Sequence, residues 1–215
     1  MKPKQRFWQW FEANEAGIHE MVVSILRPKV DIQEVNQLPT WKNLHRQLAR
    51  VHPGLLFQFG YAAPTVLEFL VSAGGIFKLA HCTKELVAQA PSLPRWKFVA
   101  FRQPLEMFEQ ASIGILIDGT ERNVSFGEIK ATLGQPNHNR FDVNLYIPYF
   151  DKANGEEDPL IWHVLDASVG EYNVMTRVGI PRGFPIEEAP VNAQPLTALQ
   201  DFSLSQTFLA DCREI

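Results

Sequence analysis

The sequence is poor in cysteine: its 215 residues include only Cys82 and Cys212. Two cysteines are too few for a disulfide framework, and their wide separation does not match a CxxC metal or redox site. This usage is typical of a reducing compartment. We therefore expect a cytoplasmic protein.

Long apolar runs are also missing. The longest apolar-rich stretch, 66–73, is interrupted by Glu68 and Ser72 and is far shorter than the about 20 residues that a membrane-spanning helix needs. The basic N-terminus continues into aromatic residues interleaved with Gln9 and Glu12, unlike the uninterrupted apolar region of a secretion signal. These features predict no membrane segment and no secretion signal.

No strong excess of one charge is present. Lys and Arg number 20 against 24 Asp and Glu, which gives a net charge of -4 at pH 7. The positive charges are scattered, whereas a nucleic-acid-binding protein concentrates them on one face. We therefore expect no nucleic-acid partner, and the acidic balance favours a more basic protein as partner because complementary charge steers association.

Motifs of common cofactor and catalytic sites are absent as well. The chain has no GxGxxG, no P-loop lysine, no GxSxG and no HExxH. Its histidines show no metal-ligand spacing: His45 and His52 are seven residues apart, and His81 beside Cys82 is better interpreted as the neighbour of a buried thiol. We expect no cofactor and no metal, and these absences favour a non-catalytic protein over an enzyme.

The residues that are present predict an α+β fold. Apolar residues make up 46% and aromatic residues 11% of the chain, enough for one compact body, so we expect a single domain over 1–215. The periodicity predicts, in order, helices over 5–16 and 41–51, a β-hairpin of 55–61 and 66–71, and a helix over 76–90. It then predicts strands over 95–101, 113–117, 124–133 and 141–147 and a helix over 160–169. We expect Gly17 to end the first helix, Thr40 to be the N-cap of the second, and 134–139 to form a loop.

This order contains little βαβ alternation, which favours a mainly antiparallel sheet with helices packed on it and an aromatic helix at the N-terminus. The proline-rich segment 181–195 also contains apolar residues, so we expect it to pack on the body. A short helix near 196–209 is expected after it.

Two sets of residues are candidates for a ligand site. Ser72, Gly74 and Gly75 lie between a predicted strand and a predicted helix, where backbone N–H groups can hold an anion; the alternative is a tight turn that uses the glycines for positive φ. His163 and Asp166 are three residues apart on a predicted helix, and Glu171 lines the same groove if that helix continues; the alternative is an ordinary polar helix surface.

Two further groups of residues each have a structural and a functional interpretation. Trp8 and Trp10, with Phe7 and Phe11, would anchor a partner if exposed, whereas aromatic residues at helical spacing usually pack in a core. The carboxylates of Asp118, Glu121 and Glu128 fit a hairpin turn and a solvated surface better than acid–base chemistry.

Several stretches, taken in order, resemble a family of uncharacterised bacterial cytoplasmic proteins of about 200 residues. They are Phe7 to Glu15 (FWQWFEANE), Phe69 to Gly75 (FLVSAGG), Ala90-Pro91 with Trp96 to Arg102 (WKFVAFR), and Leu165-Asp166 with Gly170-Glu171-Tyr172. The resemblance implies a single α+β domain and no known activity, cofactor or site. At one position this chain departs from it: Gly74 stands where the family leads us to expect an Asp.

The composition and motifs together favour a non-catalytic module that binds another protein, of the immunity or accessory type. The alternative is a small-molecule-binding protein or enzyme with its site beside the 72–75 turn or at the His163, Asp166 and Glu171 helix.

Overall fold

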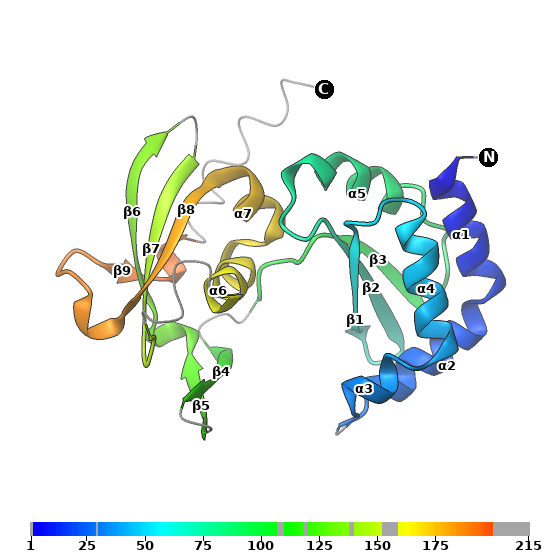
Figure 1. Ribbon diagram of the computed structural model, residues 1–215, viewed down its shortest axis with the longest axis horizontal. Coiled ribbons are helices and arrows are strands. Elements are labelled where there is room, and N and C mark those ends of the chain that lie inside the picture. The colour runs from blue at the N-terminus through cyan, green and yellow to red at the C-terminus, as the bar shows by residue number, and fades with distance from the viewer. Residues whose placement is uncertain are drawn as a thin grey trace. The chain divides into compact units, whose positions relative to one another are not determined.

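The structure, a computed structural model, describes residues 2–28, 30–106, 110–117, 120–137, 140–151 and 159–199 (Figure 1). The chain divides into two compact units, Met1–Arg102 and Gln103–Ile215, where the sequence analysis expects one body. Each unit has its own sheet and its own buried core. The junction at Arg102 and Gln103 has no Gly- or Ser-rich composition that would have marked it as a boundary.

The N-terminal unit is a three-stranded sheet with helices packed on it. Its elements are α1 (Pro3–Ala13), α2 (Glu15–Ile25), α3 (Ile32–Val35), α4 (Pro39–Ala49), β1 (Leu56–Ala63), β2 (Val66–Ser72), the 3-10 turn η1 (Phe77–Leu79), α5 (Ala80–Val87) and β3 (Trp96–Ala100). The strand order is β1-β2-β3, in which β1 and β2 form the predicted antiparallel hairpin and β3 lies parallel to β2.

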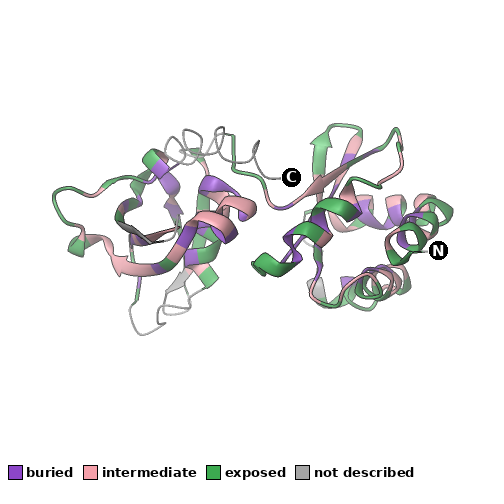
Figure 2. Ribbon diagram, turned by 90° about the horizontal axis from the view of Figure 1, so that it is seen from above, coloured by how far each residue is buried: buried purple, intermediate pink, exposed green. Residues whose placement is uncertain are grey.

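One face of this sheet is aromatic. Side chains alternate between the two faces of a strand, and the register places Phe59 opposite Phe69 and Phe69 opposite Phe98. Phe69 is fully buried, and its ring lies 5.4 Å from that of Phe11 in α1. In Figure 2 the helices of this unit carry buried residues on one side and exposed residues on the other. The predicted amphipathic helices therefore supply the cover of an aromatic core.

The boundaries of two predicted helices were wrong. Gly17 does not end the first helix, because α1 stops at Ala13 and α2 runs through Gly17 from Glu15. The break falls at Asn14, whose side-chain Nδ2 donates to the carbonyl of Trp10 at 2.8 Å. Thr40 is not the N-cap of the next helix, since α4 begins one residue earlier with Pro39 at its first position.

The C-terminal unit contains a hairpin, a four-stranded sheet and two helices. Its elements are β4 (Ser112–Ile117), β5 (Thr120–Ser125), η3 (Phe126–Glu128), β6 (Lys130–Asn137), β7 (Arg140–Ile147), α6 (Pro159–Val169), α7 (Glu171–Arg177), β8 (Val178–Pro185), η5 (Ile186–Glu188) and β9 (Gln194–Pro195). β4 pairs with β5, and the larger sheet has the order β8-β7-β6-β9. Antiparallel pairs predominate, which confirms the predicted α+β class.

Three details of this unit differ from the sequence-based prediction or complete it. The predicted strand 124–133 is two strands separated by η3, where Ser125 accepts from the Gly127 N–H and Glu128 from the Ser125 N–H. The predicted loop after Gly134 is strand as far as Asn137. The first five residues of the proline-rich segment, 181–185, lie in β8, an edge strand, where a missing N–H donor is tolerated. The turn at Asp118 and the helix expected near 196–209 fall largely outside the described residues.

Candidate functional site

The 72–75 turn is closed by its own hydrogen bonds. The Oγ of the buried Ser72 accepts from the Gly74 N–H at 2.9 Å, and the Ile76 N–H donates to the carbonyl of Ala73 at 3.1 Å. Gly74 and Gly75 have φ values of 61° and 75°, which favour glycine. The helix α5 begins only at Ala80. The geometry is thus that of a tight turn, in which these two amides already have intramolecular partners.

The same turn presents an apolar surface that the sequence analysis did not anticipate. Leu56, Ile76 and Phe77 are 46%, 47% and 56% exposed. Leu56 lies against the turn, because a Cβ added to Gly74 would be 3.4 Å from its Cδ1. Scattered exposed apolar residues are normal, and these three belong to β1 and to the two positions that follow the turn.

The second candidate set lies on two helices. His163 is exposed and Asp166 half-buried on α6, which ends at Val169. Gly170, with φ 82°, separates it from α7, whose first residue is Glu171, only 1% exposed. The helix does not continue, so the groove expected from a single long helix is not formed, and His163 and Glu171 lie at different depths.

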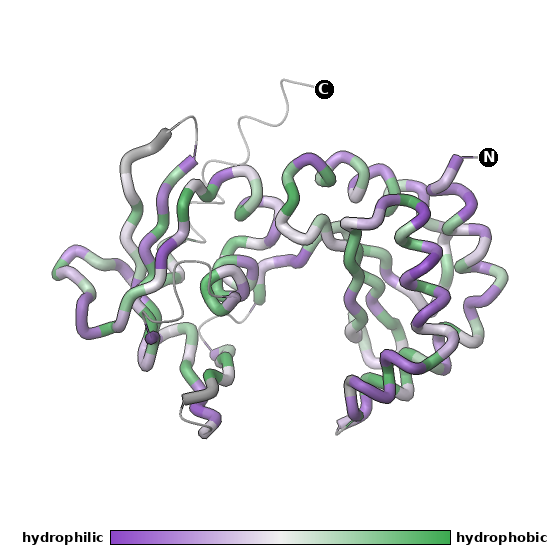
Figure 3. The backbone as a smooth tube through the Cα atoms, viewed as in Figure 1, coloured by the Kyte–Doolittle hydropathy of each residue, from purple (hydrophilic) through white to green (hydrophobic). Residues whose placement is uncertain are grey.

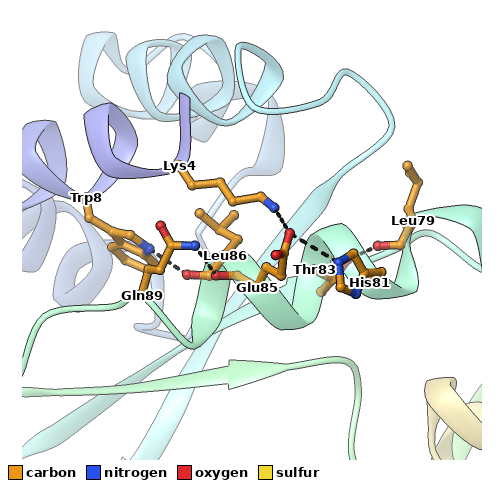
Figure 4. Close-up of polar contacts among 8 residues, drawn as sticks. All are labelled: Lys4, Trp8, Leu79, His81, Thr83, Glu85, Leu86 and Gln89. Carbon is orange, nitrogen blue, oxygen red and sulfur yellow. Dashed lines mark hydrogen bonds and ion pairs between the residues drawn. The ribbon is translucent and has the colours of Figure 1, made fainter. Parts of the chain in front are cut away.

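Trp8 is part of the N-terminal core. It is 3% exposed, and its Nε1 donates to the carbonyl of Leu86 in α5 at 2.7 Å (Figure 4). Beside this contact Lys4 pairs with Glu85, which also faces His81 at 3.4 Å, and the hydrogen bond from Lys4 lowers the pKa of Glu85. Trp10 is half-buried. These contacts join α1 to α5.

A pocket of about 480 Å³ lies elsewhere in this unit, at neither predicted place. It is bounded by α4, the edge strand β1 and the chain from the end of α2 to α3, and its lining residues are Ile25, Leu26, Val30, Val35, Trp41, Phe57, Gln58 and Phe59. The indole Nε1 of Trp41 is buried with no hydrogen-bond partner among the described residues. A buried donor without a partner costs about 1–3 kcal/mol.

His45 lies one helical turn beyond Trp41 in α4. Its ring is 4.5 Å from that of Phe57 and 5.3 Å from that of Trp41. Burial lowers the pKa of His45, which favours its neutral form. His45 therefore packs against two aromatic residues of the pocket wall, Trp41 and Phe57, in its neutral form.

Positive charge lies farther round the same helix. Lys42, Arg46 and Arg50 follow at four-residue spacing, which places them in one exposed row about 12 Å long. We call this row the α4 basic stripe. Each side chain donates to a neutral amide oxygen, those of Gln37, Asn43 and Gln47 respectively, and across the described ranges none is paired with a carboxylate. The four-residue spacing of these cations is visible in the sequence, but the small negative net charge of the whole chain gave no indication of a basic surface.

Within the described ranges, no three His, Cys, Asp or Glu side chains gather closely enough to hold a metal ion. No described helix combines the length and hydrophobicity needed to cross a bilayer. Comparisons with models of known protein families, with curated proteins and with solved structures found no match. The resemblance to a bacterial family stays a prediction.

Proposed function

We propose that this chain is a protein-interaction module whose N-terminal unit binds an acidic partner protein in the bacterial cytoplasm. The observation that carries this proposal is the division of charge between the two units. Residues 1–102 hold 13 Lys and Arg against 7 Asp and Glu, a net charge of +6, whereas residues 103–215 hold 7 against 17, a net charge of -10. The overall charge of -4 hides both values.

Such a division suits association with partners of opposite charge. Complementary charge accelerates encounter and fixes orientation. In the N-terminal unit the α4 basic stripe offers three cations whose polar partners are neutral amides, so an incoming carboxylate need not displace an existing ion pair. The basic partner expected from the total charge would instead suit the C-terminal unit. The free thiol of Cys82 fits a reducing cytoplasm.

The experiment is affinity capture from native lysate on the full-length chain, with identification by mass spectrometry and titration of the captured protein. We expect a saturable acidic partner whose affinity falls as salt rises from about 50 to about 500 mM, because salt screens exposed charges. The triple variant Lys42→Glu, Arg46→Glu and Arg50→Glu should weaken binding at least about tenfold.

The matched control is Lys2→Glu, Arg6→Glu and Lys78→Glu, which changes the net charge equally at exposed positions away from α4. The control should retain the partner. The proposal is overturned if no saturable partner is captured, if both triple variants lose it equally, or if the captured material is nucleic acid.

A further inference from the structure

We infer that the outer edge of β1 and the pocket beside it form a docking groove for an extended acidic segment of the partner. This inference rests on the proposed function and names its site. The segment would pair with β1 as an added strand, place one apolar side chain in the pocket and direct its carboxylates toward the α4 basic stripe. Strand addition of this kind combines main-chain hydrogen bonds with side-chain pockets.

The hydrogen bonds of β2 identify which groups of β1 face outward. The Leu67 N–H donates to Arg95 at 2.9 Å and the Val71 carbonyl accepts from Phe101 at 2.8 Å, so these two residues of β2 face β3. The alternate residues of β2 must then face β1. By the register, Leu56, Gln58 and Gly60 use their backbone groups toward β2, and those of Phe57, Phe59 and Tyr61 point to the open edge.

This edge lacks the features that usually protect one. β1 is eight residues long and contains no charged residue and no proline. Among the described residues, no backbone group of β1 has a partner on the outer side. The opposite edge strand, β3, is five residues long and includes Lys97, which pairs with Glu68. A long uncharged edge strand is a template for pairing with another chain. Figure 3 shows β1 hydrophobic along much of its length.

The pocket is placed to receive a side chain of the added strand. Phe57 and Phe59, whose backbone groups face outward, also contribute their rings to its wall, 4.9 and 6.1 Å from the ring of Trp41. A volume of about 480 Å³ lies within the range of natural ligand pockets.

The charged residues on either side of the groove favour an acidic segment and determine on which side its carboxylates lie. Each residue of a helix advances by about 100° around the helix axis, so Lys42 lies next to the flank of α4 that carries Trp41 and His45. The α4 basic stripe therefore runs beside that flank. On the other side, α3 exposes Glu34, and Asp31 precedes it. Carboxylates of the segment are therefore attracted toward α4 and repelled from α3. A nucleic acid would supply phosphates for the stripe but no alternating donors and acceptors for the strand edge, so the edge favours a peptide.

The probe is a fluorescein-labelled peptide of alternating Glu and Val with one central Leu, titrated against the full-length chain by anisotropy, with amide exchange measured by NMR. We expect binding that protects the amides of Phe57, Phe59 and Tyr61, while those of Gln58 and Gly60 are already protected. The same peptide with Lys in place of Glu should bind at least about tenfold more weakly.

Two single substitutions test the groove separately from the charge. Tyr61→Pro removes one outward N–H, and its control Tyr61→Val keeps that donor and the strand propensity. Val30→Trp, at a position 39% exposed on the pocket wall, fills the pocket. Tyr61→Pro and Val30→Trp should each weaken the peptide at least about tenfold, with unchanged thermal unfolding.

The outcomes distinguish this inference from the proposed function. If a captured acidic partner depends on the α4 basic stripe but not on Tyr61→Pro or Val30→Trp, the module stands and the groove is wrong. Absence of peptide binding, binding without the alternating protection, or displacement of the peptide by an oligouridylate would each overturn the groove. If no partner is captured at all, the proposed function fails first.

Discussion

The buried cores of the two units are built from different kinds of side chain. In the N-terminal unit aromatic rings gather around Phe69, which lies within 6.2 Å of the rings of Phe7, Trp8, Phe11 and Phe98. In the C-terminal unit the buried cluster is largely aliphatic, with Leu145, Ile147 and Ile161 fully covered. Ring contacts prefer particular interplanar geometries. The packing of the first core therefore depends more on the orientation of its side chains than the packing of the second core does.

Surface charge differs as well. The +6 of the first unit and the -10 of the second show that net charge is a property of each body rather than of the chain. A sum over a chain with two cores averages two units of opposite net charge. The lesson is that charge should be counted after the units are known. If the two cores are independent, core substitutions should change the free energy of unfolding of each unit separately.

The largest effect is expected from Phe69→Ala. Removing a fully buried aromatic side chain typically costs about 3–5 kcal/mol, and here it also removes two edge-to-face ring contacts, with Trp8 and Phe98. Four of the five tryptophans, Trp8, Trp10, Trp41 and Trp96, lie in the N-terminal unit. Tryptophan fluorescence in a urea titration therefore reports mainly on that unit, and its midpoint should fall strongly.

The matched change is Leu145→Ala, which opens the aliphatic core at a cost of about 2–5 kcal/mol. If the units unfold independently, Leu145→Ala lowers the urea midpoint of the transition followed by far-ultraviolet circular dichroism. The midpoint of the transition followed by tryptophan fluorescence then stays nearly unchanged. A tryptophan midpoint that shifts equally in both variants would mean that the units unfold as one, and the energetic comparison would fail.

A smaller, pH-dependent effect is expected from Glu15→Gln. Glu15 accepts from Trp96 Nε1 at 2.6 Å and from Arg95 at 2.5 Å, which joins α2 to β3. Burial alone would raise the pKa of Glu15, but the hydrogen bonds from Trp96 and Arg95 outweigh it, so the pKa lies below its ordinary value of 4.5. A carboxyl with a lowered folded pKa stabilises the fold above its unfolded pKa and loses that contribution as pH falls through the folded pKa.

We therefore expect Glu15→Gln to lower the free energy of unfolding by about 1 kcal/mol at pH 7, reduced by partial exposure. The two proteins should converge as pH falls from about 5 to below the folded pKa. Glu20→Gln, on the exposed side of the same helix, is the control and should change little. A loss that persists unchanged at pH 3 would show that the ionised carboxylate is not the cause.

The sequence predicted the local elements of both units better than their boundaries. The hairpin at Leu56–Ser72 and the helix ending at Val169 follow from β-branched and aromatic runs and from helical spacing. The end of the first helix was misplaced at Gly17 because glycine in an exposed helix costs only about 1 kcal/mol, which neighbouring apolar contacts such as those of Ile18 offset.

The candidate site was less accessible to sequence reasoning. The pocket is formed by α2, α3, α4 and β1. Its lining residues, such as Val30, Trp41 and Phe59, are separated in the sequence, so no local motif predicts that they lie together. The open edge of β1 depends on strand order, which is a non-local property. The α4 basic stripe is the exception: Lys42, Arg46 and Arg50 show helical spacing in the sequence itself.

The smallest expected effect has the opposite sign. Gly17 lies within α2, and a Cβ added there meets no atom within 4 Å. Gly17→Ala should therefore raise the free energy of unfolding by about 0.5–1 kcal/mol, because alanine has less backbone freedom to lose on folding. The gain should appear in the tryptophan transition and be absent from that of the C-terminal unit. The same substitution at Gly75, where φ is 75°, should destabilise the N-terminal unit, since alanine is strained in that conformation. A gain at both glycines would show that backbone freedom alone, and not local conformation, sets the sign.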